Sequence, residues 1–230
     1  DWSRGWGTEG RIYWMLKLLG HQAAFILEGG FGAYADLYPA DVTEAVATLN
    51  TGAWGTDSSE QLSPQPISAT KAGIQRNSSF LVDTRTWAEY EGSREKAYGV
   101  KRDGHITSAV SFPFSALFKP RQGAPFDCLR SCQDIKSELS DLGWTPGRQI
   151  VAYCTGGVRS AFFWAVTKHC QLDGANYGGS MWEWAADTSL PMTLGPDPVI
   201  SKASAAARSQ SEHSLVQVAM SAIAVLRFLG

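Results

Sequence analysis

One cysteine in this sequence stands where its chemistry could be used. Cys154 is followed by Gly156, Gly157 and then Arg159. A cysteine acts as a nucleophile only as the thiolate, and a free pKa of about 8.5 leaves little of it ionised at neutral pH. Glycines allow successive backbone N–H groups to face one atom, and an arginine adds a fixed positive charge. The run therefore predicts an anion-binding loop around a reactive thiol.

A rough energy comparison shows why the whole loop is needed. Bringing the thiol pKa close to 7 requires about 2 kcal/mol, at about 1.4 kcal/mol per unit. A helix N-terminus usually supplies ~0.3–1 kcal/mol, so its dipole alone is too weak. The alternative is a buried, inert cysteine at the end of a core strand. The candidate site consists of the nucleophile Cys154 and a binding loop made of Thr155, Gly156, Gly157, Val158, Arg159 and Ser160.

The segments around this loop predict an α/β fold. Residues 149–153 are apolar enough for a central strand, and residues 160–170 have a helical pattern. Further strands are expected at residues 80–82 and 109–114, and a further helix at residues 132–142. Strands alternating with helices indicate a mostly parallel sheet flanked by helices, with ligands at the carboxyl ends of the strands. Cys154 follows such an end.

The chain is expected to have four parts. Residues 10–20 are predicted to form a helix and residues 23–27 a buried strand, which together would need a sheet to join. Residues 51–68 are rich in Gly, Ser, Thr, Pro and Gln, which is typical of a linker. The expected boundaries are a partial unit at 1–50, a linker at 51–75, a catalytic domain at 76–200 and a flexible or helical tail at 201–230.

The composition narrows the class of protein. The chain has 44% hydrophobic and 18% charged residues and a net charge of -2, which is typical of a globular protein without a nucleic-acid-binding surface. Four cysteines in 230 residues do not indicate a disulfide scaffold, so a reducing compartment is favoured. Cys128 and Cys132 could share a helical face, but no histidines suggest zinc, and Cys170 is expected to fill the core. We predict no metal and no cofactor.

The two ends of the chain are less informative. Residues 215–229 are apolar but shorter than the roughly 20 residues that span a bilayer. An amphipathic helix at residues 213–230 is expected to dock on the protein, on a protein partner or on a membrane surface. The chain begins at Asp1, and a leader peptide could have been removed, so the compartment is not readable from the sequence.

The catalytic loop resembles the active-site loop of the rhodanese family of sulfurtransferases. The flanking runs fit the same family: Val82 to Arg85, then Gly104-His105-Ile106, and the closing run at residues 175–184. The resemblance covers roughly residues 76 to 190. Residues 6–31 also resemble the second half of the inactive N-terminal domain of a tandem rhodanese. The resemblance thus implies a rhodanese-like sheet preceded by a partial second rhodanese-like unit with an incomplete sheet.

The family resemblance also implies a mechanism. The Cys154 thiolate would take the outer sulfur of a small donor such as thiosulfate and pass it, as a persulfide, to a thiol or to cyanide. Asp83, Arg85 and His105 would support the loops near the site. Tyr177, Trp182 and Trp184 would form walls at its mouth, by analogy alone.

Departures from the family pattern leave the donor open. Relatives tuned to thiosulfate carry basic residues where this chain has Thr155, Gly156 and Glu89. Thr107 and Ser108 replace the Pro-Gly that usually follows the Gly-His-Ile run, so the geometry of that turn is less certain.

Two other functions compete with sulfur transfer. A cysteine phosphatase of this fold would place five residues between the cysteine and the arginine, but only four separate Cys154 from Arg159, which suits a single sulfur atom better. The second alternative is a non-enzymatic role as a sulfur carrier, a redox sensor or a structural subunit.

Overall fold

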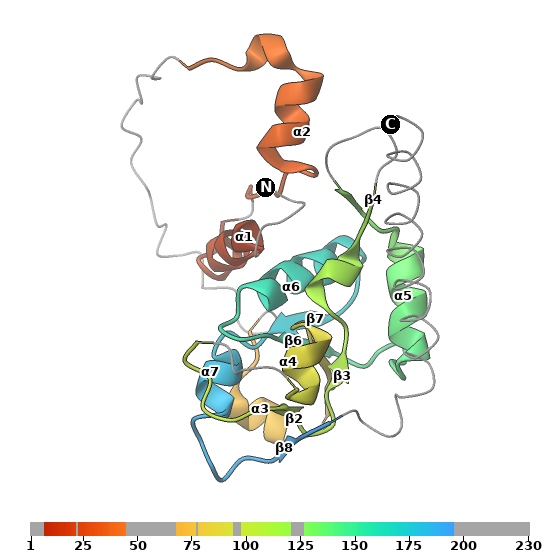
Figure 1. Ribbon diagram of the computed structural model, residues 1–230. Coiled ribbons are helices and arrows are strands. Elements are labelled where there is room, and N and C mark those ends of the chain that lie inside the picture. The colour runs from red at the N-terminus through yellow and green to blue at the C-terminus, as the bar shows by residue number, and fades with distance from the viewer. Residues whose placement is uncertain are drawn as a thin grey trace, which may run out of the picture.

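The computed structural model describes residues 7–21, 23–44, 68–76, 78–93, 98–120 and 127–195. At its centre lies a parallel sheet of four strands in the order β3-β1-β6-β7 (Figure 1). The strands are β1 (Phe80–Asp83), β3 (Val110–Ser111), β6 (Ile150–Tyr153) and β7 (Gly174–Asn176). Helices flank this sheet, so the predicted α/β class and parallel sheet are confirmed.

The two faces of the sheet bury alternate residues of the same strands. Val82 and Ala152 point to the face covered by α5 and α6, whereas Leu81 and Val151 point to the face covered by α3 and α7. This alternation follows from the two-residue period of a strand, and burial on both faces explains why 149–153 is an unbroken apolar run. The helices are α3 (Lys71–Gln75), α5 (Cys132–Asp141), α6 (Arg159–His169) and α7 (Ser180–Trp184).

The remaining strands form two small sheets separate from the central one. In these short antiparallel ribbons, β2 pairs with β8 and β4 pairs with β5. The expected strand at 109–114 is shorter than predicted, because Pro113 has no N–H to donate and a 3₁₀ helix follows it. These elements are α4 (Trp87–Glu91), β2 (His105–Ile106), the 3₁₀ helix η2 (Phe114–Leu117), β4 (Phe118–Pro120), β5 (Asp127–Leu129) and β8 (Met192–Thr193).

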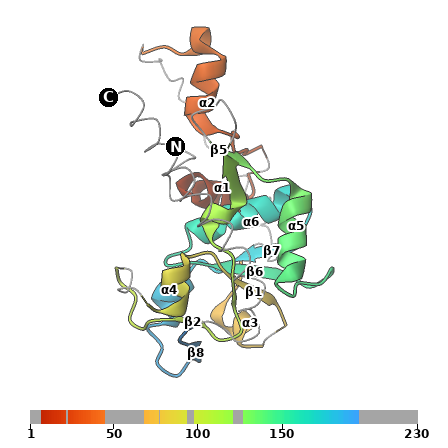
Figure 2. The same cartoon turned by 45° about the vertical axis from the view of Figure 1, so that its right-hand side comes forward.

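The predicted N-terminal helix is present as α1 (Thr8–Leu18), and it lies across α6 in both ribbon views (Figures 1 and 2). The crossing is close at Gly10, where an added Cβ atom would lie 2.3 Å from the Phe162 Cα atom. Trp14 fills the adjoining contact with Ala161 and Ala165. Small residues on both helices therefore let α1 pack directly on the helix that follows Cys154.

The strand predicted at residues 23–27 is wrong. No strand forms among residues 7–44 that the structure describes, and the Phe25 side chain is 88% exposed. A single extended segment gains little without a neighbouring strand to pair with, and none of the described strands lies beside it. After it come α2 (Gly30–Leu37) and the 3₁₀ helix η1 (Pro39–Asp41), with α2 projecting away from the sheet (Figure 2). The partial second unit at 1–50 stays a prediction.

The predicted linker ends earlier than expected. Ser68 forms a parallel bridge with Asn176, and Thr70 caps α3, so residues 68–75 are part of the folded domain. The rest of that linker, and the tail at 201–230 with its proposed docking segment 213–230, lie outside the described residues. Within the part of the chain that is described, no helix is long and apolar enough to span a bilayer.

The expectation of four reduced cysteines is wrong for two of them. Cys132 at the start of α5 and Cys170 after α6 form a disulfide, with their Cα atoms 5.2 Å apart. Both belong to the packing between these helices, which brings residues 38 positions apart into bonding range. Cys128 does not share a helical face with Cys132, because it lies in β5. Cys128 and Cys154 are free thiols.

Candidate active site

Cys154 lies where β6 ends and the loop to α6 begins. Its side chain is buried, and its sulfur accepts hydrogen bonds from the Gly157 N–H at 3.2 Å and from the Ser160 hydroxyl at 3.6 Å. Gly157 has a φ of +81°, and an added Cβ atom would lie 2.5 Å from the Gly178 carbonyl oxygen. The second glycine is therefore required both by the left-handed backbone and by the close approach of another loop.

The loop makes Cys154 more acidic than an ordinary cysteine. Burial raises the pKa of the Cys154 thiol, but the positive charge of Arg159 and hydrogen bonds from the loop outweigh it, so that the pKa is lowered from its ordinary value. The hydrogen bonds that lower it come from Ser160 and from the Gly156 backbone. A buried thiol held in this way is suited to carry a negative charge on sulfur.

Arg159 is paired with a carboxylate that sequence reasoning noted only as a departure from the family pattern. Its two terminal nitrogens donate to Glu89 at 2.9 Å and 3.0 Å, and one of them also donates to the Thr155 hydroxyl at 2.8 Å. Burial would raise the pKa of Glu89, but Arg159 and hydrogen bonds from Thr86 lower it to about 2. The net charge facing the loop is therefore smaller than Arg159 alone would provide.

The start of α4 holds Glu89 in this position. Thr86 caps the helix by accepting from the Glu89 N–H, while Glu89 Oε2 accepts from the Thr86 N–H at 3.0 Å. This reciprocal pattern is a capping box, and its Thr-x-x-Glu spacing is visible in the sequence. The spacing could have located the helix start, but it carries no sign that Arg159 lies opposite.

The predicted supporting residues lie behind the loop. Arg85 and Asp83, at the end of β1, form a buried ion pair, and Arg85 also donates to the Gly104 carbonyl at 2.8 Å. His105 Nδ1 is hydrogen-bonded to the Tyr90 carbonyl at 2.9 Å. These bonds connect β1, α4 and β2 with one another, and none of them goes to the Cys154 sulfur.

The N-terminus of α7 holds the end of β6, which the sequence did not indicate. The Cys154 N–H donates to the Ser180 hydroxyl at 3.1 Å, and that hydroxyl donates to the Tyr177 carbonyl at 2.7 Å. The Met181 N–H donates to the Cys154 carbonyl at 3.1 Å. Ser180 and Met181 thus fix the backbone of Cys154 at the end of β6.

Only one of the three aromatic residues expected at the site lies against the loop. Trp182 contacts Gly156 so closely that an added Cβ atom would lie 2.4 Å from its ring, and its side chain is half exposed. Its indole N–H donates to the Tyr98 carbonyl at 2.8 Å. Tyr177 and Trp184 are instead buried in the core on the α3 and α7 face; on α7, Trp184 lies three residues after the buried Met181, whereas Trp182 lies on the exposed side.

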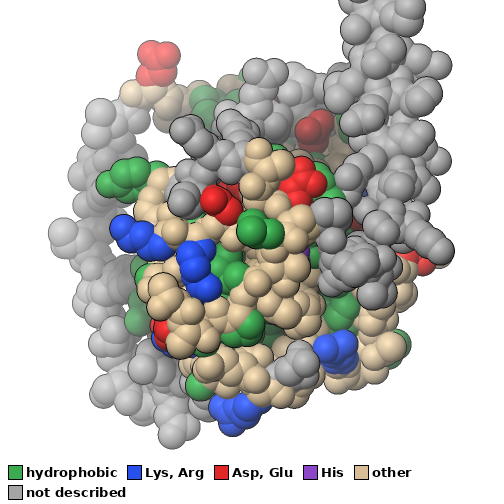
Figure 3. All heavy atoms as spheres, turned by 60° about the horizontal axis from the view of Figure 1, so that its bottom comes forward, with side chains coloured by type: hydrophobic (Ala, Val, Ile, Leu, Met, Phe, Trp, Pro, Cys, Tyr) green, Lys and Arg blue, Asp and Glu red, His purple; other side chains and the backbone are tan. Residues whose placement is uncertain are grey.

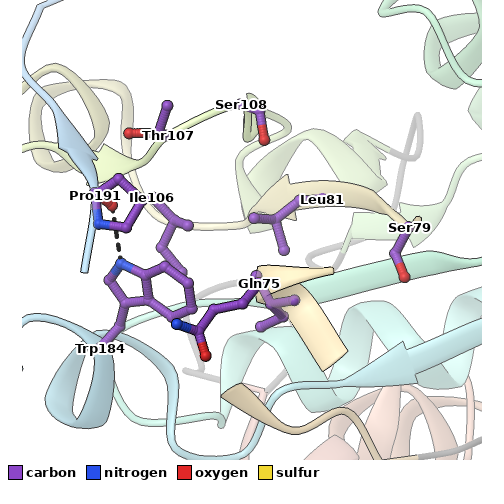
Figure 4. A pocket seen from close by; sticks show the side chains of 9 residues that line it. Gln75, Ser79, Leu81, Ile106, Thr107, Ser108, Trp184 and Pro191 are labelled. Carbon is purple, nitrogen blue, oxygen red and sulfur yellow. Dashed lines mark hydrogen bonds between the residues drawn. The ribbon is translucent and has the colours of Figure 1, made fainter. Parts of the chain in front are cut away.

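A separate cavity of about 330 Å³ lies between α3, the β2–β8 ribbon and α7 (Figure 4). Leu81, Ile106 and Trp184 form its apolar wall, and Gln75, Thr107 and Ser108 contribute uncharged polar groups. Its lining residues include hydroxyl groups but no cysteine, no histidine and no charged side chain that could activate them.

Charged side chains give no other candidate. On the face of the molecule seen in Figure 3, Lys and Arg side chains are spread in small groups among apolar and uncharged ones. Among the described residues, no group of three or more His, Cys, Asp or Glu side chains is placed to hold a metal ion. The loop around Cys154 is therefore the site that the geometry favours.

Comparison with known proteins identifies the family of the chain. The model of the Rhodanese-like domain family matches residues 67–187. The chain belongs to the rhodanese family. The matched stretch contains the Cys154 loop, its flanking helices and all four strands of the parallel sheet, and the predicted family is thereby confirmed.

Named rhodanese relatives include enzymes and a carrier. The chain is 30% identical over 200 residues to a thiosulfate sulfurtransferase of Pseudomonas aeruginosa, covering 84% of this chain and 68% of the relative. It is 25% identical over 197 residues to the sulfur carrier protein TtuD of Thermus thermophilus, covering 80% of this chain and 66% of the relative. The chain thus spans about two thirds of the length of these relatives.

A solved structure shows the same fold. The structure of EanB in complex with ergothioneine superposes with a TM-score of 0.68 at 20% identity, covering 82% of this chain and 45% of that chain. At this identity the likeness concerns the fold alone.

Proposed function

We propose that the protein is a sulfurtransferase that carries a sulfane sulfur on Cys154. The observation that carries this proposal is the buried Cys154 sulfur, which accepts hydrogen bonds from Gly157 and Ser160 beside the Arg159 cation. These donors stabilise the thiolate before the reaction, and they can stabilise the persulfide anion after it. Membership in the rhodanese family and the sulfurtransferase relatives support the same chemistry.

The two half-reactions balance without a cofactor. The Cys154 thiolate attacks the outer sulfur of thiosulfate, the sulfur–sulfur bond of the donor breaks, and sulfite leaves with the electron pair. Cys154 then carries a persulfide anion. A thiolate or cyanide attacks the terminal sulfur, and the Cys154 thiolate leaves.

The donor is the finer question, and the Glu89–Arg159 pair bears on it. A doubly negative donor such as thiosulfate would approach an arginine whose charge is already neutralised by a carboxylate 2.9 Å away. The charge pattern therefore favours a donor of lower negative charge over thiosulfate, such as an organic persulfide, which releases a thiolate, or mercaptopyruvate, whose carbon–sulfur bond breaks to release the enolate of pyruvate. The same pair argues against a phosphate dianion and therefore against phosphatase activity.

The direct test measures thiocyanate formation from cyanide with thiosulfate and, separately, with mercaptopyruvate as donor. We expect the wild type to turn over at least one donor, Cys154→Ser to be inactive, and Cys128→Ser to keep wild-type activity as the matched control for a free thiol. Equal thiocyanate formation by wild type and Cys154→Ser would overturn the proposed function.

A sulfur-carrier role is the second candidate. It is favoured by the likeness to a protein named as a sulfur carrier. A carrier would acquire the persulfide but release its sulfur slowly to cyanide and quickly to a protein thiol. The ratio of these two release rates separates the carrier from the enzyme.

A further inference from the structure

Helix α1 touches the catalytic loop although it precedes the stretch that matches the family model. Arg11 lies on α1, and its Nη1 atom donates to the Gly157 carbonyl at 3.3 Å. The same carbonyl accepts from the Asn176 side-chain amide, also at 3.3 Å. The family model begins at residue 67, so Arg11 lies outside the stretch that this model matches.

The backbone N–H and the backbone carbonyl of Gly157 form hydrogen bonds on opposite sides of the loop. Its N–H donates to the Cys154 sulfur at 3.2 Å, while its carbonyl is held by Arg11 and Asn176. A glycine at a φ of +81° has no Cβ atom to restrict rotation of the neighbouring peptides. If the carbonyl were released, the loop could turn a carbonyl oxygen toward the thiolate, which would repel it. Donors on the outside of the loop therefore keep the N–H groups on the inside.

Packing holds the Arg11 guanidinium in place. It lies over the Trp14 ring at 4.7 Å from the ring centroid, and the Trp14 ring in turn contacts Gly178. Trp14 is buried between α1 and α6, where Gly10 allows the two helices to approach closely. A planar guanidinium can stack on an aromatic ring and donate from its edge in the same geometry, which a lysine cannot reproduce.

We propose that Arg11 is a positioning residue for the Cys154 loop, and that α1 is thereby part of the scaffold of the active site. Arg11 acts through Gly157 and does not contact the sulfur itself. This proposal rests on the proposed function, which gives the loop its role in sulfur transfer. Its test measures the acidity of Cys154, which does not depend on turnover.

The experiment is the rate of alkylation of Cys154 by iodoacetamide as a function of pH, in the full chain carrying Cys128→Ser. We compare Arg11→Met and Arg11→Lys with the parent protein, and we use Lys17→Met as a control that removes a cation from the same helix. Loss of one hydrogen bond that orders the loop should raise the alkylation midpoint of Arg11→Met by about half a pH unit. Arg11→Lys should lie between Arg11→Met and the parent, and Lys17→Met should match the parent.

Two results would overturn the proposal. One is an unchanged midpoint in Arg11→Met, and the other is an equal shift in Lys17→Met, which would attribute the effect to α1 as a whole. If Arg11→Met does not fold, Arg11→Lys decides, because it keeps the charge and loses the stacked fork. Failure of the proposed function is a separate result, seen as sulfur transfer that persists in Cys154→Ser whatever the alkylation midpoints are.

Discussion

Two arginine–carboxylate pairs lie near the catalytic loop and differ in their surroundings. Asp83 and Arg85 are almost fully enclosed, with side chains 0% and 3% exposed, and Arg85 also donates to the Gly104 carbonyl. Glu89 and Arg159 are 13% and 9% exposed, and the charge of Arg159 lowers the pKa of the Cys154 thiol. We infer that the two ion pairs have different roles. The enclosed Asp83–Arg85 pair stabilises the fold, and the Glu89–Arg159 pair determines the net charge near the Cys154 sulfur.

Breaking the enclosed pair should have the largest effect. Asp83→Asn leaves Arg85 buried without a counter-charge, and we expect it to lower the free energy of unfolding by about 3–5 kcal/mol in urea. The matched control is Asp187→Asn, which removes the carboxylate of an exposed pair with Lys71 and should cost far less. Equal losses in the two variants would contradict the assignment of the first pair to stability.

Removing Arg159, the cation of the second pair, should make the Cys154 thiol less acidic. Arg159→Met takes away the charge that lowers the pKa of Cys154, so the thiolate fraction at pH 7 should fall by at least about tenfold. The alkylation rate of Cys154 against pH measures this change, with the midpoint moving to higher pH. Arg159→Lys should retain part of the effect, because it keeps the charge. An unmoved midpoint in Arg159→Met would show that the loop amides alone make the thiol acidic.

Removing the carboxylate of the second pair should have a smaller and opposite effect. Glu89→Gln leaves Arg159 with an unneutralised charge, so we expect the KM for thiosulfate to fall about threefold to tenfold. Glu91→Gln, on the same helix, is the control for lost negative charge, because the Glu91 carboxylate accepts from the exposed Ser93 hydroxyl. A KM that rises in Glu89→Gln would mean that the carboxylate positions Arg159 for the donor.

The acid dependence of stability tests the Glu89–Arg159 pair without an activity assay. The pKa of Glu89 is lowered to about 2 in the folded protein, against an ordinary value of 4.5. Its contribution to stability is therefore fully present above the ordinary value and is lost as the pH falls through this window. The difference in unfolding free energy between wild type and Glu89→Gln should shrink from about pH 6 to about pH 3. A difference that does not change with pH would contradict the ion pair.

The sequence predicted the parts of the molecule that depend on local pattern. The apolar run before Cys154, the glycines after it and the helical run from Ser160 were sufficient to predict β6, the loop and α6. Contacts between distant segments were not predictable in this way. Nothing in the spacing connects Glu89 with Arg159, Cys132 with Cys170 or Arg11 with Gly157, because the fold alone brings them together.

The strand expected at 23–27, which does not form, also shows that local pattern cannot predict contacts between distant segments. An apolar run predicts burial, but a strand forms only where another strand offers its backbone. In the described residues no strand lies beside that segment, and Phe25 remains exposed. The spacing of apolar residues therefore predicts a strand or helix reliably only when the segments that it packs against are also present.

The most direct test of the central claim is the intact mass of the protein after incubation with a sulfur donor, compared with Cys154→Ser. Thiosulfate and mercaptopyruvate are used in turn, and excess donor is removed before measurement under non-reducing conditions. We predict that the wild type gains the mass of one sulfur atom with at least one donor, that a thiol reductant removes it, and that Cys154→Ser gains none. A sulfur adduct of equal abundance on Cys154→Ser, or no adduct on the wild type with either donor, would contradict the account.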